Sequence, residues 1–311
     1  MEDRNKAKDT VKSYGSDVKR VFNHISSKYY PGRNFDSVNM HEITGSQVKE
    51  VEREMLHSNK FSSATLIRTR QSWNEFCAWC NATVLNFITK LKPGTEYRDE
   101  PISNIQVAKM LEYTDKQINN AKTTSKKIQW AKINILLHIG CGLGLRSCEY
   151  EYLTFPEVER SGTVRIINSK HNANRTIPLT QEAIFAISTL KEILIASNKM
   201  PKCGSIFVNS RGQKHDTSTY RRWIKKVAKE CKIPLHLAKT HGLRHRFAIN
   251  FNKYKKNDIM LADIMGHKSV ETTRNYARES RAAQKRALEG GYAKVINYLV
   301  KHSHPRRLAK E

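Results

Sequence analysis

The sequence predicts a mainly α-helical protein with a small antiparallel sheet, built from a helical domain followed by an α+β domain. Two observations support this fold class. Apolar residues recur at helical spacing through most of the chain, and only a few short runs in its second half are rich in β-branched residues. A segment with two prolines, a glycine and several charges separates the halves at residues 93–101, as expected of a linker. The 311 residues suffice for two domains, since single domains usually contain roughly 100–200 residues.

Residues 1–92 form the first predicted domain, and no part of them indicates a strand. Cys77 and Cys80 form a Cys-x-x-Cys pair, but the second Cys or His pair that a zinc site needs does not follow. We therefore expect buried helix residues rather than metal ligands or a redox pair. Two apolar faces at helical spacing support the helices: Val11, Val18, Val21, Phe22 and Ile25, then Leu66, Trp73, Phe76, Cys77, Cys80, Val84 and Phe87.

Residues 102–278 form the second predicted domain. Ile128–Ile139 is apolar enough for a buried helix, and the glycines of Gly140–Gly144 permit a tight turn after it. Val164–Asn168 and Thr176–Leu179 are short β-rich runs joined by a polar segment, which predicts a hairpin.

Helices are predicted to follow the hairpin. Thr180 is a suitable N-cap for an amphipathic helix, with Glu182 in its first turn, where the helix dipole favours an acid. Ser205–Val208 is a further predicted strand, and from Ser218 onward the pattern is again mainly helical. The last segment, residues 279–311, is predicted to be a helical tail.

The charge of the chain indicates a polyanionic partner. Lysine and arginine outnumber aspartate and glutamate by 55 to 29, a formal charge of +26, and nucleic acid fits this best. A membrane surface fits less well, because no terminus forms a basic amphipathic helix and no run of about 18 apolar residues occurs. The charged N-terminal residues lack the apolar core of a secretory signal, and six scattered cysteines do not make a disulfide framework. We expect a cytoplasmic protein with reduced thiols and no membrane partner.

Two segments of the second domain place arginines beside residues able to assist them. Arg146 follows a glycine turn, and Glu149 lies one helical turn later, where it is able to orient the guanidinium group. In His241-Gly-Leu-Arg244, the spacing places both side chains on one helix face, from which both are able to reach one phosphate.

A third segment contains Gly266-His267 and, shortly after it, Tyr276. A helix beginning near Ser269 would bring the tyrosine hydroxyl back toward the histidine. Taken singly, each of these residues has an ordinary explanation: Arg244 as a surface phosphate contact, His267 as a core histidine and Tyr276 as part of an amphipathic helix.

In combination, these residues suit nucleophilic attack on a DNA phosphodiester. The guanidinium groups of Arg146 and Arg244 are able to bind the charge that develops on the phosphate oxygens. The hydroxyl of Tyr276 is protonated at neutral pH, so it needs a proton acceptor or a positive pocket, and His241 and His267 are the candidates.

Lys170 is the candidate general acid for the departing deoxyribose oxygen. It is the only lysine between residues 162 and 179, and it lies on the polar turn of the hairpin. A metal-dependent nuclease is not favoured, because Glu149 and its acidic neighbours are not joined by the Asp and His residues that two metal ions require.

With these residues in place, the segment from about 140 to 278 resembles the tyrosine recombinase, or phage integrase, family. Arg246 stands where a small threonine is common and Met265 where leucine is usual, and neither change removes a catalytic group. Five segments resemble the family's motifs in order: Gly-Leu-Arg146 with Glu149, Lys170 with Arg175-Thr-Ile-Pro-Leu179, Thr240-His241-Gly-Leu-Arg244-His245, Met265-Gly-His267, and Thr272-Thr-Arg-Asn-Tyr276.

The resemblance implies that Tyr276 forms a 3′-phosphotyrosyl bond with cut DNA, which a free 5′-hydroxyl later reverses, without a metal or nucleotide cofactor. It implies that residues 1–92 are a helical core-binding (SAM-like) domain that clamps the duplex, and that residues 102–278 are the catalytic domain. Four protomers would assemble on two double-stranded recombination sites and exchange strands through a Holliday junction, with DNA-bending accessory proteins as further potential partners.

In such an assembly, residues 279–311 would make the contact between neighbouring protomers. The tail is equally suited to packing within its own chain. The apolar stripe that would serve either arrangement consists of Leu288, Tyr292, Val295, Ile296 and Leu299.

Two other functions fit parts of the pattern. A type IB topoisomerase uses the same chemistry to relax DNA, but it acts as a monomer and needs no docking tail. A non-catalytic DNA-binding protein would keep the basic clamp, but its motif positions would have decayed, whereas every one of them is filled here. We therefore expect a site-specific recombinase that mediates integration, excision or transposition.

Overall fold

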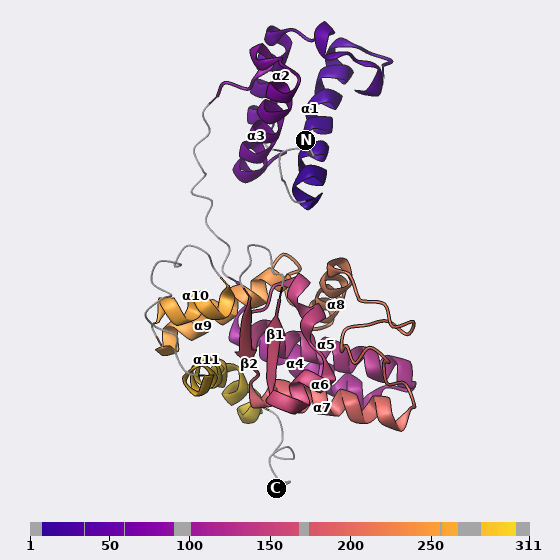
Figure 1. Ribbon diagram of the computed structural model, residues 1–311, viewed down its shortest axis with the longest axis vertical. Coiled ribbons are helices and arrows are strands. Elements are labelled where there is room, and N and C mark those ends of the chain that lie inside the picture. Colours follow the sequence, from indigo (N-terminus) through magenta and orange to yellow (C-terminus); the bar gives the residue numbers. More distant parts are fainter. Residues whose placement is uncertain are drawn as a thin grey trace. The chain divides into compact units, whose positions relative to one another are not determined.

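The computed structural model describes residues 8–33, 35–58, 60–89, 101–167, 174–255, 257–266 and 281–302. It divides into two compact units, Met1–Arg98 and Asp99–Glu311, and the division falls within the segment 93–101 (Figure 1). Each unit has its own hydrophobic core. Among the described residues, no helix is both long and apolar enough to cross a membrane.

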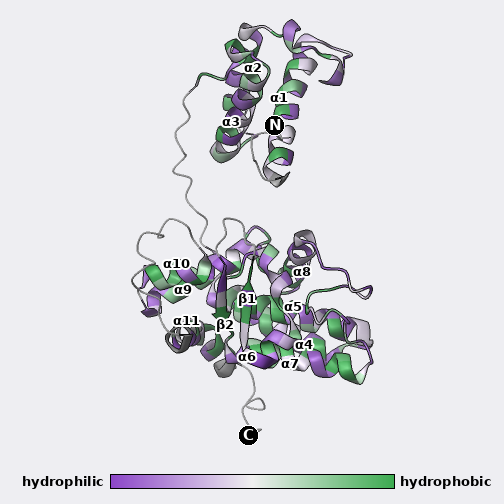
Figure 2. Ribbon diagram, viewed as in Figure 1, coloured by the Kyte–Doolittle hydropathy of each residue, from purple (hydrophilic) through white to green (hydrophobic). Residues whose placement is uncertain are grey.

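The first unit is helical, with no strand among its described residues. Helix α1 packs against both α2 and α3, and Val21, Ile25 and Trp73 are fully buried between them. In Figure 2 these helices are striped, because hydrophobic and hydrophilic residues alternate along them. The elements are α1 (Lys8–Tyr29), α2 (Gly45–His57), α3 (Ser63–Trp79) and the short 3-10 helices η2 (Phe35–Ser37), η3 (Met40–Glu42) and η4 (Thr83–Leu85).

The cysteine pair of this unit lies at the end of α3. Cys77 is buried in the core, as predicted, and burial raises the pKa of its thiol to about 12. Cys80 is half-buried at the C-cap of the helix. Val84 was predicted on the same apolar face, and this is wrong: its side chain is 79% exposed, because α3 ends at Trp79 and Val84 lies on η4.

The second unit is built around helix α5, in which every residue from Trp130 to Gly142 is buried. Helices α4, α7 and α9 pack against it. The buried helix predicted at residues 128–139 is therefore present, and it continues to Gly142. The helices of this unit are α4 (Asn104–Asn120), α5 (Thr124–Gly142), η5 (Ser147–Tyr152), α6 (Phe155–Ser161), α7 (Gln181–Ala196), α8 (Thr217–Glu230), α9 (Thr240–Lys255), α10 (Asp258–Met265) and α11 (Arg281–His302).

Among the described residues of this unit, two strands form a sheet: β1 (Thr163–Ile166) and β2 (Arg175–Pro178). They are antiparallel, with Thr163 opposite Pro178 and Ile166 opposite Arg175. The predicted fold class, mainly α-helical with a small antiparallel sheet, is confirmed.

The strand predicted at Ser205–Val208 is wrong. Ser205 and Val208 make only isolated bridges, to Thr154 and Lys214 respectively, so the segment joins no ladder. The apolar residues of this segment are explained by burial, because the consecutive Ile206 and Phe207 are both fully buried. The segment is a loop whose side chains pack into the core.

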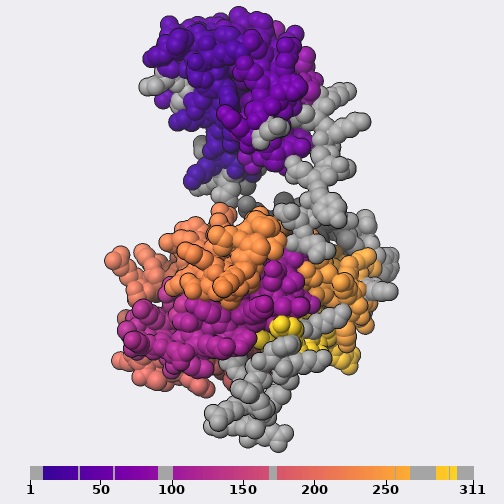
Figure 3. Space-filling model, turned by 180° about the vertical axis from the view of Figure 1, so that it is seen from behind, coloured from indigo at the N-terminus to yellow at the C-terminus, as the bar shows by residue number. Residues whose placement is uncertain are grey.

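Helix α11 packs within its own chain, which is one of the two arrangements expected of the tail. Leu288 and Val295 are buried in the core of the second unit, and the Tyr292 hydroxyl lies 2.9 Å from Nδ1 of His138. In the space-filling view of Figure 3, yellow atoms of α11 lie beside the magenta atoms of α4, which it contacts. Leu288, Tyr292 and Val295 of the stripe are therefore buried within the chain, and a contact between protomers made by residues 279–311 stays a prediction.

Candidate active site

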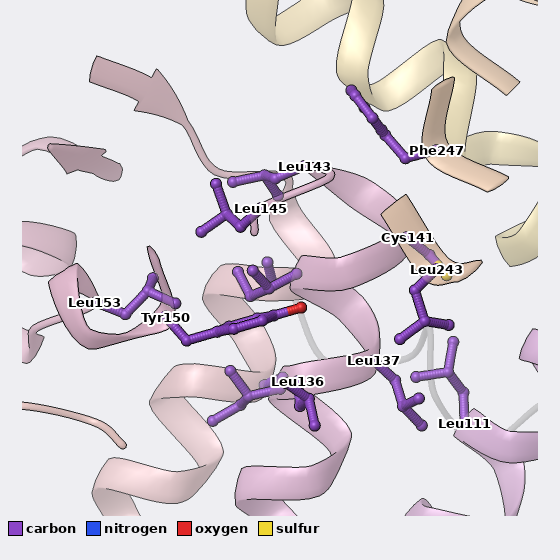
Figure 4. Close-up of a cluster of buried hydrophobic side chains, with 14 of the residues drawn as sticks. Leu111, Leu136, Leu137, Cys141, Leu143, Leu145, Tyr150, Leu153, Leu243 and Phe247 are labelled. Carbon is purple, nitrogen blue, oxygen red and sulfur yellow. The ribbon is translucent and has the colours of Figure 1, made fainter. Parts of the chain in front are cut away.

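The turn after α5 places Arg146. Gly144 has a φ of +66°, and a Cβ atom there would lie 2.2 Å from the ring of Phe247, so only glycine fits. On either side of it, Leu143 and Leu145 are buried, and Figure 4 shows both side chains in the cluster that contains Tyr150. The turn is thus fixed at both ends, and Arg146 follows as the N-cap of η5.

Glu149 is buried beneath Arg146, and its side chain is 1% exposed. Its Oε2 accepts the backbone N–H of Arg146 at 2.8 Å, and its Oε1 accepts Nη1 of the same residue at 2.9 Å. The orienting contact predicted from the spacing is present.

A second arginine, Arg175 at the start of β2, shares the same carboxylate. Its Nη1 donates to Oε1 of Glu149 at 3.0 Å and its Nη2 to Oε2 at 2.9 Å. Burial alone would raise the pKa of Glu149, but the hydrogen bonds and charges of Arg175 and Arg146 outweigh burial and lower it. The carboxylate is therefore ionised at neutral pH.

Arg244 reaches the same place from α9, and it is 4% exposed. Its Nη1 donates to the carbonyl oxygen of Gly144 at 2.7 Å and its Nη2 to that of Met265 at 2.8 Å. Burial, together with the charge of nearby Arg146, lowers the pKa of Arg244 to about 10. The group stays protonated at neutral pH, and a bound anion would offset the cost of burying its charge.

The C-terminal end of α10 holds all three arginines. The carbonyl oxygens of its last residues and its cap accept one hydrogen bond from each: Ile264 from Nε of Arg175 at 2.7 Å, Met265 from Nη2 of Arg244 at 2.8 Å, and Gly266 from Nη2 of Arg146 at 2.9 Å. The partial negative charge at a helix C-terminus favours these cations.

The cap position favours glycine. Gly266 has a φ of +65°, and a Cβ atom on it would lie 2.7 Å from Nη1 of Arg175. The chain leaves this cap directly into His267.

The structure therefore brings together Arg146, Glu149 and Arg244 of the predicted site. His241 lies on α9 one turn before Arg244. Its side chain is exposed, whereas that of Arg244 is buried. The predicted residues Lys170, His267 and Tyr276 lie outside the described residues, so their roles stay predictions.

This arrangement is suited to binding a phosphate. The guanidinium groups of Arg146 and Arg175 share the Glu149 carboxylate, and that of Arg244 lies at the same helix end and donates to carbonyl oxygens. Guanidinium groups bind phosphate oxygens through paired hydrogen bonds, and fixed donors of this kind stabilise negative charge that develops in a transition state.

Reasoning from the sequence did not assign a role to Arg175. Its partners Glu149 and Ile264 are distant in sequence, so no local spacing links them. The signal available was an arginine that opens a β-rich run ending in buried residues, Ile177 and Pro178.

Comparison with known proteins shows the family to which the chain belongs. The model of the phage integrase family matches residues 101–283, a range that contains Arg146, Arg175 and Arg244. The chain belongs to the phage integrase family. As a member of this family it is a tyrosine recombinase, an enzyme of DNA recombination.

Several tyrosine recombinases are similar to this family member over most of its length. The tyrosine recombinase XerC of Rickettsia massiliae (strain Mtu5) is 25% identical over 286 residues, which cover 89% of this chain and 88% of the relative. XerC of Rickettsia conorii (strain ATCC VR-613 / Malish 7) is 26% identical over the same shares.

Solved structures share the fold of this integrase family member. The XerH recombinase bound to its difH substrate has a TM-score of 0.61 at 20% identity, covering 86% of this chain and 77% of that one. The lambda integrase tetramer bound to a Holliday junction has a TM-score of 0.58 at 16% identity, covering 89% and 74%.

Proposed function

We propose that this recombinase cuts and rejoins one strand of double-stranded DNA at a time, with Tyr276 as the nucleophile. One observation carries the proposal: Arg146 and Arg244 converge with Glu149 at the C-terminal end of α10. The chain continues from that end into the segment that contains His267 and Tyr276. A phosphate bound by the two arginines would lie where this segment begins.

The proposed reaction is a transfer of the phosphoryl group to tyrosine. The hydroxyl oxygen of Tyr276 forms a bond to phosphorus and gives up its proton to His241 or His267. The bond from phosphorus to the 5′-oxygen breaks, and Lys170 protonates the leaving oxygen. The product is a 3′-phosphotyrosyl bond and a free 5′-hydroxyl, which attacks in the reverse step to rejoin DNA.

Arg146 and Arg244 stabilise the extra negative charge of the transition state. Both guanidinium groups are held by carbonyl oxygens before DNA binds, so they need no reorientation during the reaction. Glu149 does not touch the phosphate in this proposal. It orients Arg146 through two hydrogen bonds.

We infer that the substrate is a pair of recombination sites joined by four protomers, with strand exchange through a Holliday junction. The formal charge of +26 supports a DNA partner, and the likeness to a lambda integrase tetramer on a Holliday junction supports the assembly. In this proposal residues 1–92 form the DNA clamp and residues 102–278 the catalytic domain. The outcome in the cell is integration, excision or transposition of a DNA segment, and DNA-bending proteins are potential accessory partners.

The deciding experiment uses a DNA site with a nick beside the cleavage position. The short fragment that carries the 5′-hydroxyl then dissociates after cleavage, so rejoining is prevented and the covalent complex accumulates. Wild-type protein should form a complex that survives denaturation, and Tyr276→Phe should bind the same DNA with unchanged affinity but form none. The substitution removes only the hydroxyl group. Covalent product from Tyr276→Phe would therefore show that Tyr276 is not the nucleophile.

A second measurement separates recombination from simple relaxation. A supercoiled plasmid that carries two sites should yield recombinant circles. Relaxed plasmid without recombinant circles would instead favour topoisomerase activity.

A further inference from the structure

Arg175 is a buried charge to which the proposed reaction gives no task. Its side chain is 9% exposed, whereas that of Arg146 is 28% exposed. Of the two arginines that share Glu149, Arg146 is the more exposed, whereas each of the three guanidinium nitrogens of Arg175 already donates to Glu149 or to Ile264.

The contacts of Arg175 join three elements of the site. Two of its nitrogens bind both oxygens of Glu149 on η5, and its Nε binds the carbonyl oxygen of Ile264 at the end of α10. The residue itself opens strand β2. One planar side chain thus fixes the carboxylate, the helix end and the hairpin relative to one another.

We propose that Arg175 is a positioning residue for the recombination reaction, which holds Glu149 so that Arg146 is presented to the scissile phosphate. The inference rests on the proposed function, because it assumes that Arg146 binds that phosphate. Arg175 itself does not touch DNA.

The hydrogen bonds of Glu149 explain how this works. Each carboxylate oxygen accepts one hydrogen bond from Arg146 and one from Arg175. If the Arg175 bonds are lost, a buried carboxylate keeps its charge and loses half of these donors. The Arg146 guanidinium is then drawn onto the carboxylate and away from the phosphate, since a buried anion needs its hydrogen bonds replaced.

Lysine is not able to replace Arg175. An ammonium group keeps the positive charge, but it lacks the planar fork that binds two carboxylate oxygens while a third nitrogen binds a carbonyl group. Arg175→Lys therefore tests geometry with the charge preserved. Arg165→Lys is the matched control, because Arg165 lies on the paired strand β1, opposite Thr176, and is exposed.

The experiment measures two quantities for each full-length variant: the dissociation constant for the nicked DNA site, and the rate of covalent complex formation at saturating DNA. We expect Arg175→Lys to slow the covalent step about 100-fold, the order of loss that a small misplacement of a catalytic group causes. Its DNA affinity should change less than about threefold, because the contact with DNA is made by other residues. Arg165→Lys should match wild type in both.

A double-mutant cycle then asks whether Arg175 acts through Arg146. In an Arg146→Lys background, where the guanidinium to be positioned is already gone, Arg175→Lys should cost less than about fivefold. An equal loss in both backgrounds would overturn the proposal, and so would a wild-type covalent rate for Arg175→Lys. A loss of affinity or of melting temperature that accounts for the whole rate change would overturn it too.

The inference and the proposed function fail in different ways. If the wild-type protein forms no Tyr276-dependent covalent complex, the proposed function is wrong. If it does form that complex and Arg175→Lys forms it equally fast, only the role of Arg175 is wrong.

Discussion

Glu149 is an ionised side chain in a place that water hardly reaches. It remains charged because Arg146 and Arg175 bind both of its oxygens, and these contacts lower its pKa against the effect of burial. A carboxylate whose folded pKa lies below its ordinary value stabilises the fold above that ordinary value, here 4.5. This contribution is lost as the pH falls through the folded pKa.

Glu149→Gln should therefore destabilise the second unit at pH 7 by about 3 kcal/mol, the order expected when one partner of a buried ion pair is removed. Below pH 4.5 the difference from wild type should narrow, because Glu149 of the unfolded chain takes up a proton there while the folded carboxylate, with its lowered pKa, is still ionised. Chemical denaturation at pH 7 and pH 4 measures both effects.

The control for this change is Glu159→Gln. Glu159 is an exposed acid that pairs with Lys191, and its loss should change the free energy of unfolding by no more than about 0.5 kcal/mol. A Glu149→Gln protein as stable as this control at pH 7 would contradict the assignment of Glu149 as a buried ion.

At the level of single residues, the sequence predicts contacts that local spacing determines. Arg146 and Glu149 are one turn apart, so their contact follows from geometry. Arg175 is 26 residues from Glu149 and 89 residues from Ile264, and only the folded chain brings them together. The burial of Arg244 was also not predictable, because it depends on how closely α9, α10 and the Gly144 turn approach one another.

At the level of elements, helices with clear caps and apolar faces were predictable, and short segments were less so. Thr180 caps α7 as expected, its side chain accepting the N–H of Ala183. The segment Ser205–Val208 has the composition of a strand. Its apolar residues are buried in the core, but they do not pair with another strand in a ladder. Burial and strand pairing select the same residue types, so composition alone does not separate them.

Helix α11 presented a similar ambiguity, since an apolar stripe suits a partner or the same chain. In the structure it covers its own unit, and Glu289 accepts the N–H of Gln181 at the start of α7. The helix thereby shields part of the core in the single protomer.

Leu288→Ala should therefore lower the free energy of unfolding of the isolated protomer by about 3 kcal/mol, because Leu288 is 1% exposed and a cavity would remain. Asn297→Ala, an exposed change on the same helix, should have almost no effect. Thermal or chemical unfolding at low protein concentration makes the comparison. Equal stability of the two variants would mean that α11 is not docked on its own chain in solution.

At the level of the whole molecule, the excess of positive charge dominates the interaction with DNA. Each phosphate neutralised by lysine or arginine releases a counterion, so the logarithm of the association constant falls by about 0.9 per phosphate for each unit of log salt concentration. The formal charge of +26 is ample for several such contacts.

We expect the DNA affinity of this protein to fall roughly 1000-fold or more between 50 and 200 mM salt. Fluorescence anisotropy with a labelled duplex gives the slope directly. Tyr276→Phe is the matched control, since it changes no charge and should give the same slope. A dissociation constant that is independent of salt would mean that the charge of the chain serves another purpose.

The carbonyl groups at the end of α10 order the three arginine side chains when the protein folds, before DNA binds. A long side chain that becomes ordered gives up conformational entropy worth up to about 2 kcal/mol, and for Arg146, Arg175 and Arg244 this loss occurs on folding. Binding the phosphate then requires little additional ordering of these three side chains, which favours association. Arg146 and Arg244 would bind any phosphodiester equally well, so other parts of the protein must distinguish one DNA sequence from another.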